Sequence, residues 1–314
     1  MPGQDGAAAR GDDEDHDRQQ IESQEERERG DSRATIIMVK PKDTTRRRGP
    51  PPRPYGAVVK VKGQGMRARK IGGFVLRLML VLLVLGLGAG LLYLRPLSAD
   101  AAALAALASE RTVQVTTTAE LIAFMPSTSP SVGLVFYPGA LVDPRAYAVI
   151  MHDLATRGIA TFIIKLPLNI AFLAPDGAGG VIATHPEIRT WAVAGHSLGG
   201  VVACSYAAAH PDRVRGLLLY ASYPAGDLSQ PLANTAILSI FGTNDGLATP
   251  AKVAANRPNL PGATRYTPIG GGIHAFFGDY GAQPGDGQPS ISRTSAQEQI
   301  VTASAAFLTA LAVP

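Results

Sequence analysis

The chain has 314 residues, with 46% apolar residues, 34 glycines and 24 prolines, which suits one α/β domain with tight turns and additional segments. The net charge is only +4, and the basic residues gather before residue 71, which argues against nucleic-acid binding by the main domain. Cys204 is the single cysteine, so the chain can form neither an intramolecular disulfide nor a metal site made of cysteines. We expect Cys204 to pack as a small apolar residue.

Residues 1–70 combine an acidic, glutamine-rich run with a proline- and arginine-rich segment. Such a composition buries too little apolar surface to offset the entropy of ordering the chain. We therefore predict a disordered, charged tail.

Residues 71–95 contain an apolar run from Phe74 to Leu94, whose length matches a helix that crosses the hydrocarbon core of a bilayer. Arg77 interrupts the run near its start, where a long side chain can reach the lipid headgroups. The run is apolar on every face, so we expect a transmembrane helix rather than a buried core helix.

Basic residues at positions 67, 69 and 70 precede this run. The positive-inside rule then predicts a single-pass protein of the cell membrane, with a cytoplasmic N-terminus and an extracytoplasmic main domain. Translation from Met66 would give the alternative, because the same run would then resemble a signal peptide and the mature protein would be secreted.

Residues 96–111 are rich in alanine and are expected to form a helical or flexible stalk, so that the folded domain occupies residues 112–314. In this domain continuous apolar runs alternate with helical stretches, which is typical of a doubly wound, mostly parallel sheet. Residues 112–117 and 120–125 alternate more loosely and suggest antiparallel edge strands. The other strands are predicted at 132–137, 160–166, 190–194, 214–221, 236–241 and 265–269, and helices at 145–157, 199–210 and 292–311.

The glycine-flanked serine of Gly195-His196-Ser197-Leu198-Gly199 falls between the predicted strand 190–194 and the predicted helix 199–210. A strand, a sharp turn and a helix are the context of a nucleophile elbow, in which the turn exposes the serine hydroxyl above the sheet. The alternative is that Ser197 is an ordinary helix cap.

Asp245 and His274 each follow a predicted strand, where the side chains of a parallel sheet meet in one site. The order Ser197, Asp245, His274 is that of α/β hydrolases. His274 would remove the serine proton, and Asp245 would orient its ring. As alternatives, Asp245 could simply form a turn and His274 lie on the surface, with Asp227 as the reserve acid.

The oxygen of a tetrahedral intermediate needs hydrogen-bond donors, and backbone N–H groups supply them in such sites. We expect one donor from Leu198, directly after the serine, and the other from Ala140 in the loop after strand 132–137. His196 is expected to be structural rather than a base.

His152, His185 and His210 are expected at the surface or in packing roles. No set of His, Asp and Glu has the spacing of metal ligands, so neither a metal nor a cofactor is expected.

The motifs around Ser197, Asp245 and His274, with residues 136–144 and 165–172, resemble the α/β-hydrolase superfamily, in particular small bacterial proteins of the "α/β-hydrolase fold-5" type. The resemblance covers nearly all of residues 112–314 and implies the same three catalytic residues. Ala140 departs from the pattern, because a glycine would be expected there.

The expected function is a membrane-anchored serine hydrolase that cleaves a carboxylic ester through an acyl-enzyme. Only about a dozen residues separate the strands predicted at 214–221 and 236–241, where many relatives insert a cap, so a small acyl group or an accessible ester is favoured. Two alternatives are an acyltransferase with the same triad and a catalytically inactive binding module.

Overall fold

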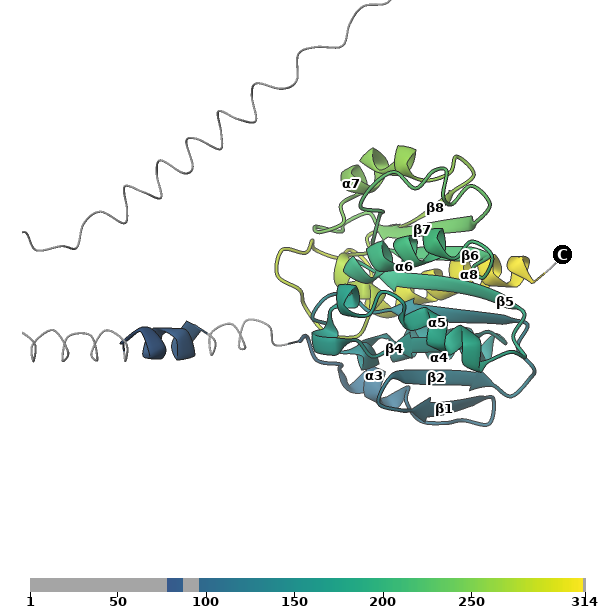
Figure 1. The fold of residues 1–314 in the computed structure, drawn as a ribbon, viewed down its shortest axis with the longest axis horizontal. Helices are drawn as coiled ribbons and strands as arrows, with labels where there is room; N and C mark the ends of the chain where they lie inside the picture. The colour runs from purple at the N-terminus through teal and green to yellow at the C-terminus, as the bar shows by residue number, and fades with distance from the viewer. Residues whose placement is uncertain (1–77, 87–95, 313–314) are drawn as a thin grey trace, which may run out of the picture. The chain divides into compact units, whose positions relative to one another are not determined.

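The computed structural model describes residues 78–86 and 96–312 (Figure 1). Residues 78–86 form a helix. Within these two ranges, no helix has both the length and the apolar character that a membrane crossing requires. The tail predicted at 1–70 and all but residues 78–86 of the predicted span from Phe74 to Leu94 lie outside the described residues.

The domain is built on one eight-stranded sheet with the order β1-β2-β4-β3-β5-β6-β7-β8. Strands β1 and β2 are antiparallel to each other and β2 is antiparallel to β4, whereas all pairs from β4 to β8 are parallel. The strands are β1 (Val113–Thr117), β2 (Leu121–Pro126), β3 (Val132–Tyr137), β4 (Ala160–Ile164), β5 (Thr190–His196), β6 (Gly216–Tyr220), β7 (Ala236–Gly242) and β8 (Arg265–Ile269). The predicted mostly parallel sheet with two antiparallel edge strands is therefore confirmed.

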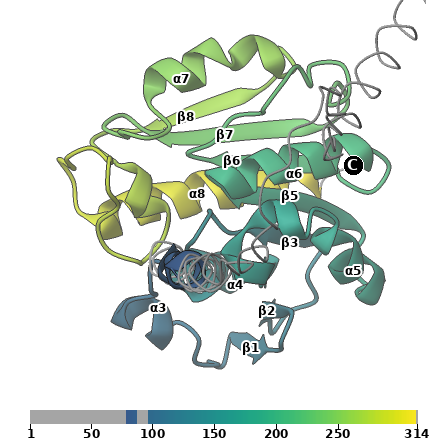
Figure 2. The ribbon, with the colours of Figure 1, turned by 60° about the vertical axis from the view of Figure 1, so that its left-hand side comes forward.

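Helices cover both faces of this sheet (Figures 1 and 2). On one face α4 (Ala148–Thr156) packs against α8 (Arg293–Leu311), and on the other α5 (Gly177–Thr184) and α6 (Leu198–Ala209) contact the central strands. Of these four, α5 was not predicted. The remaining elements are α3 (Ala101–Ala105), α7 (Pro250–Ala255) and the 3-10 turns η1 (Pro144–Tyr147), η2 (Pro167–Asn169), η3 (Ala171–Leu173), η4 (Arg257–Asn259) and η5 (His274–Phe277).

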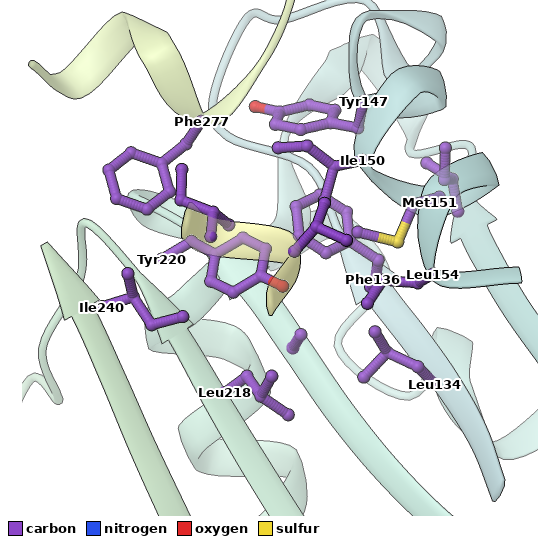
Figure 3. Packing of buried hydrophobic residues seen from close by; sticks show 14 of the residues in the cluster. Leu134, Phe136, Tyr147, Ile150, Met151, Leu154, Leu218, Tyr220, Ile240 and Phe277 are labelled. Carbon is purple, nitrogen blue, oxygen red and sulfur yellow. The ribbon is translucent and has the colours of Figure 1, made fainter. Parts of the chain in front are cut away.

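Two apolar clusters fill the spaces between sheet and helices, and β3 contributes to both. Leu134 and Phe136 point to the cluster under α4 and α8, which Figure 3 shows, while Val135 and Tyr137 point to the cluster under α5 and α6. Successive side chains of a strand face opposite sides of its sheet, so a central strand with both faces covered needs apolar residues throughout. All six residues of β3 are buried accordingly.

Residues 221–235, between β6 and β7, contain no helix or strand. This is where a cap would be inserted, and the short connection leaves the carboxyl ends of β5 and β6 without such a cover. This short connection agrees with the prediction of a minimal cap or none.

The segment predicted as a stalk, residues 96–111, makes specific contacts with the domain. The N–H of Leu97 donates to the carbonyl of Leu141 over 2.7 Å, and the carbonyl of Leu97 accepts from the N–H of Asp143 over 2.9 Å. Asp100 caps α3 and forms an ion pair of 2.6 Å with Arg293 at the start of α8. Contacts distant in sequence therefore hold residues 97 and 100 against the domain.

Candidate active site

Ser197 lies at the turn between β5 and α6, at the carboxyl end of the central strand. Its backbone has φ 51° and ψ −121°, a conformation that non-glycine residues rarely adopt and that costs about 1–3 kcal/mol. The N–H of Ser197 donates to the carbonyl of Tyr220 over 3.0 Å, and its carbonyl accepts from the hydroxyl of Ser222 over 2.7 Å. These bonds to the neighbouring strand hold the turn in its strained form.

The flanking glycines allow backbone segments to approach each other closely at this turn. A Cβ atom on Gly195 would overlap the backbone of Gly199, and one on Gly199 would overlap the carbonyl oxygens of Tyr137 and Pro138. The loop after β3 therefore lies directly against the start of α6. A side chain at Gly199 would separate the two segments that the sequence predicts to form the oxyanion hole, and one at Gly195 would separate β5 from the start of α6.

Asp245 and His274 form a buried pair at the ends of β7 and β8. Nδ1 of His274 lies 2.9 Å from Oδ2 of Asp245, and the two residues are 1% and 3% exposed. Oδ1 of Asp245 accepts from the N–H groups of Leu247 and Ala248 over 2.8 and 2.7 Å. Both oxygens of this carboxylate thus have partners, and the carboxylate can hold the histidine ring in one orientation.

The loops that carry this pair are themselves joined. The N–H of Gly271 donates to the hydroxyl of Thr243 over 2.8 Å, and the N–H of Asn244 donates to the carbonyl of Gly272 over 2.9 Å. These bonds continue the β7–β8 pairing past the ends of the strands.

A cavity of about 220 Å³ opens beside Ser197 and His274. Besides these two residues its walls comprise Leu198, Val201, Ala221, Ser222, Tyr223, Leu247 and Ala248. Nε2 of His274 is buried and has no hydrogen-bond partner among the described residues. The nitrogen that would accept a proton from a serine is therefore unengaged and belongs to a residue lining the same cavity as Ser197.

Two backbone N–H groups that the sequence predicts as oxyanion donors have no acceptor in the part of the chain that the structure describes. They belong to Leu198, the first residue of α6, which lines the cavity, and to Ala140 in the loop after β3, which is not among the cavity walls. The start of a helix carries unpaired N–H groups and a partial positive charge, which together favour an oxyanion. Leu141, next to Ala140, has φ 54° and donates to the carbonyl of Asn169 over 2.8 Å, which fixes the loop.

His196, inside the elbow, is buried below the site and does not line the cavity. Its Nδ1 lies 2.9 Å from the hydroxyl of Tyr147, and that hydroxyl accepts from the N–H of Gly139 over 2.9 Å. A hydroxyl can take part in more than one hydrogen bond, so Tyr147 joins His196 to Gly139. His196 thus supports the loop after β3 through Tyr147, which agrees with the structural role expected for it.

The environment of His196 keeps its ring neutral. Burial, and secondarily the nearby His274, hold the pKa of His196 well below its usual value. Its ring centroid lies 4.5 Å from that of His274, and the ring stacks on Phe277. A neutral neighbour adds no standing charge beside the Asp245–His274 pair.

The other candidates lie elsewhere. Asp227, the reserve acid, is exposed and accepts a hydrogen bond from the N–H of Ser229 in its own turn. His152 is buried with its ring edge-on to Phe124. His185 and His210 are partly exposed at the ends of α5 and α6, and Cys204 is buried on α6.

The sequence did not indicate a role for Tyr147 or Asp286. The side-chain oxygens of both residues accept hydrogen bonds from backbone N–H groups in the loops of the site. Tyr147 is the last residue of η1, which begins at a proline, and Asp286 lies in a glycine-rich turn, so both resemble ordinary turn residues. Within residues 78–86 and 96–312, no group of three or more His, Cys, Asp or Glu side chains could hold a metal ion.

Comparison with known proteins defines the class. Residues 133–298, just over half of the chain, match the model of the alpha/beta hydrolase family. The chain belongs to the alpha/beta hydrolase family, as its resemblance in sequence indicated.

Individual relatives are more distant. A pimeloyl-[acyl-carrier protein] methyl ester esterase of Neisseria meningitidis is 41% identical over 80 residues, which are 26% of this chain and 28% of that protein. The chain therefore aligns with less than a third of the length of this curated relative. Among solved structures, Est1E from Butyrivibrio proteoclasticus has a TM-score of 0.46 and 13% identity over 65% of this chain and all of that chain. Carboxyl esterase 2 from Tuber melanosporum has a TM-score of 0.49 and 13% identity over 69% of this chain and 91% of that chain.

Proposed function

We propose that this protein is a serine hydrolase that cleaves carboxylic esters through an acyl-enzyme, with Ser197 as nucleophile, His274 as general base and Asp245 as the acid that orients it. One observation carries the proposal. His274 and Asp245 form a buried pair of 2.9 Å, Nε2 of His274 has no hydrogen-bond partner among the described residues, and His274 lines the same cavity as Ser197.

Each residue has a defined part in the proposed reaction. His274 Nε2 takes the proton of Ser197 as its oxygen attacks the ester carbonyl, and Asp245 stabilises the imidazolium that forms. The N–H groups of Leu198 and Ala140 stabilise the negative oxygen of the tetrahedral intermediate. His274 then returns its proton to the leaving alcohol, and a water molecule releases the acid by the same steps in reverse order.

The cavity supports a preference for short acyl groups. Its volume of about 220 Å³ lies below the range of about 300–1,000 Å³ that is common for drug-sized ligands, and its walls are largely apolar. Because residues 221–235 form no cap, a bulky alcohol part can remain outside in solvent. The methyl ester esterase relative also supports an ester as the bond that is cleaved.

A fluorophosphonate probe tests the nucleophile without a choice of substrate. The full chain should be labelled, whereas Ser197→Ala should not, and His274→Ala or Asp245→Asn should react about 10⁴-fold more slowly. Ser205→Ala is the matched control, because Ser205 is exposed on the same helix and donates only to the carbonyl of Val201. Absence of labelling in the folded parent would contradict the proposal and favour an inactive binding module.

Product analysis with p-nitrophenyl esters of increasing acyl length completes this test. Acetate and butyrate esters should react faster than octanoate, and the free acid should be the main product. A dominant ester product in the presence of added alcohol would instead identify an acyltransferase.

We further propose that the protein is held in the cell membrane by the apolar run from Phe74 to Leu94, with the N-terminus cytoplasmic and the hydrolase domain outside. The length of the run and the basic residues before it support this topology. In a bacterial host, the chain should stay with membranes at alkaline pH, and protease added outside should reach the domain but not the tail. Release of a mature domain into the medium would favour secretion.

A further inference from the structure

Asp286 lies in the loop between η5 and α8, and its carboxylate binds both loops that carry the Asp245–His274 pair. Oδ1 accepts from the N–H of His274 over 3.1 Å and from the N–H of Gly246 over 3.2 Å. Oδ2 accepts from the N–H of Ala275 over 2.8 Å. Asp286 therefore bonds directly to the backbone of His274 and to the residue that follows Asp245.

The turn around Asp286 is fitted closely to the loop of Asp245. The N–H of Gly287 donates to Oδ1 of Asp286 over 2.7 Å, and a Cβ atom on Gly287 would overlap the carbonyl of Asn244. A Cβ atom on Gly246 would lie 2.6 Å from the carbonyl of Gly285. Neither loop can move apart from this turn without losing hydrogen bonds of a carboxylate, which are stronger than those between neutral groups.

We propose that Asp286 is a positioning residue for the catalytic pair, which sets the distance and angle between Asp245 and His274 by holding their backbones in one frame. This inference rests on the proposed function of Ser197, His274 and Asp245. A carboxylate fits the position because it has only acceptor oxygens, and all four contacts come from N–H donors. An amide of the same shape would direct N–H groups against at least one of these donors.

The proposal gives Asp286→Asn a defined kinetic signature. We expect kcat to fall about 100-fold with KM within a factor of about three, because a small misalignment of catalytic groups has this effect and the cavity walls do not include Asp286. The rate of fluorophosphonate labelling should fall as well, while the whole sample still becomes labelled. A simple loss of folded protein would instead lower the fraction that becomes labelled.

Asp286→Ala provides a second test, since it removes the carboxylate and leaves space for a small anion beside a partly exposed site. Added formate should restore part of the lost kcat in Asp286→Ala, and chloride at equal ionic strength should not. Asp227→Asn is the matched control, because Asp227 is exposed and binds only within its own turn. It should keep the parent kcat and labelling rate.

The outcomes separate this inference from the proposed function. A parent that reacts with the fluorophosphonate probe, together with an Asp286→Asn variant that has parental kcat and labelling rate, would overturn the role of Asp286 alone. A lower kcat that reflects only a smaller labelled fraction, with no effect of formate on Asp286→Ala, would also overturn it. A parent that does not react would instead contradict the triad itself.

Discussion

Single residues determine the chemistry of this site through their partners. Asp245 uses both oxygens, one on His274 and the other on two backbone N–H groups, so its orientation is fixed before a substrate binds. Ser197 is held in a strained conformation by the neighbouring strand. His196 is buried without lining the cavity and supports the loop after β3 through the Tyr147 hydroxyl.

The buried His196 predicts a pH dependence of stability. Its pKa is lowered in the folded state by burial, whereas in the unfolded chain it is about 6.5. Above this value the ring is neutral in both states. As the pH falls below about 6.5, His196 binds a proton in the unfolded state but stays neutral in the folded state. Its contribution therefore lowers the free energy of unfolding by up to about 1.4 kcal/mol per pH unit.

Urea unfolding at pH 7.5 and pH 5.5 measures this effect against His196→Asn, which keeps an acceptor for the Tyr147 hydroxyl but does not titrate. The variant should be less stable than the parent at pH 7.5, because the ring stacked on Phe277 is lost, yet it should lose less stability on acidification. Equal losses in the two proteins would mean that His196 does not contribute.

At the scale of elements, the site depends on how closely β5, α6 and the loop after β3 approach one another. Alanine at Gly199 would overlap the carbonyl oxygens of Tyr137 and Pro138, which are backbone atoms and cannot rotate away. Gly199→Ala should therefore lower the free energy of unfolding by more than about 2 kcal/mol, or reduce fluorophosphonate labelling at least tenfold if the loop moves instead.

Gly262→Ala is the matched control for this prediction, because its new Cβ atom would have no neighbour within 4 Å. It should change stability by no more than about 0.5 kcal/mol and leave the labelling rate intact. Chemical denaturation and probe kinetics on both variants give the answer, and a Gly199→Ala protein that behaves like Gly262→Ala would refute the close-approach argument.

At the scale of the whole molecule, the first described residues of the domain are attached to its last helix. Arg293 of α8 lies 2.6 Å from Asp100, the cap of α3, and 3.2 Å from Asp279. Asp279 is buried, and burial raises its pKa despite the arginine. These contacts close the domain by joining segments nearly two hundred residues apart in the chain.

Replacing Arg293 by Met keeps most of the side-chain volume and removes the cation from two carboxylates. We expect the free energy of unfolding at pH 7 to fall by about 2 kcal/mol, because one of these carboxylates is buried. Limited proteolysis should then cut more readily between residues 97 and 106. Arg145→Met is the control, since its pair with Asp143 is half exposed at the arginine and should contribute less than about 1 kcal/mol.

The sequence by itself determined the sheet and the three residues of the proposed triad, for a physical reason. Buried parallel strands must be apolar along their whole length, so β3 was predicted with its observed bounds, and polar residues directly after the strands of such a sheet meet at one edge. The glycines around Ser197 were equally informative, because only a tight strand-to-helix turn requires them.

Only the tertiary structure decided how the site is supported and how residues 97 and 100 are held to the domain. Tyr147 and Asp286 act through backbone N–H groups of distant loops, and any sequence at those loops offers the same N–H groups, so no pattern of residue types reveals the contact. Leu97 joins the domain through its backbone and Asp100 through an arginine far along the chain, which local composition cannot show. Contacts made by the backbone, or between residues far apart in the chain, arise only when the chain has folded.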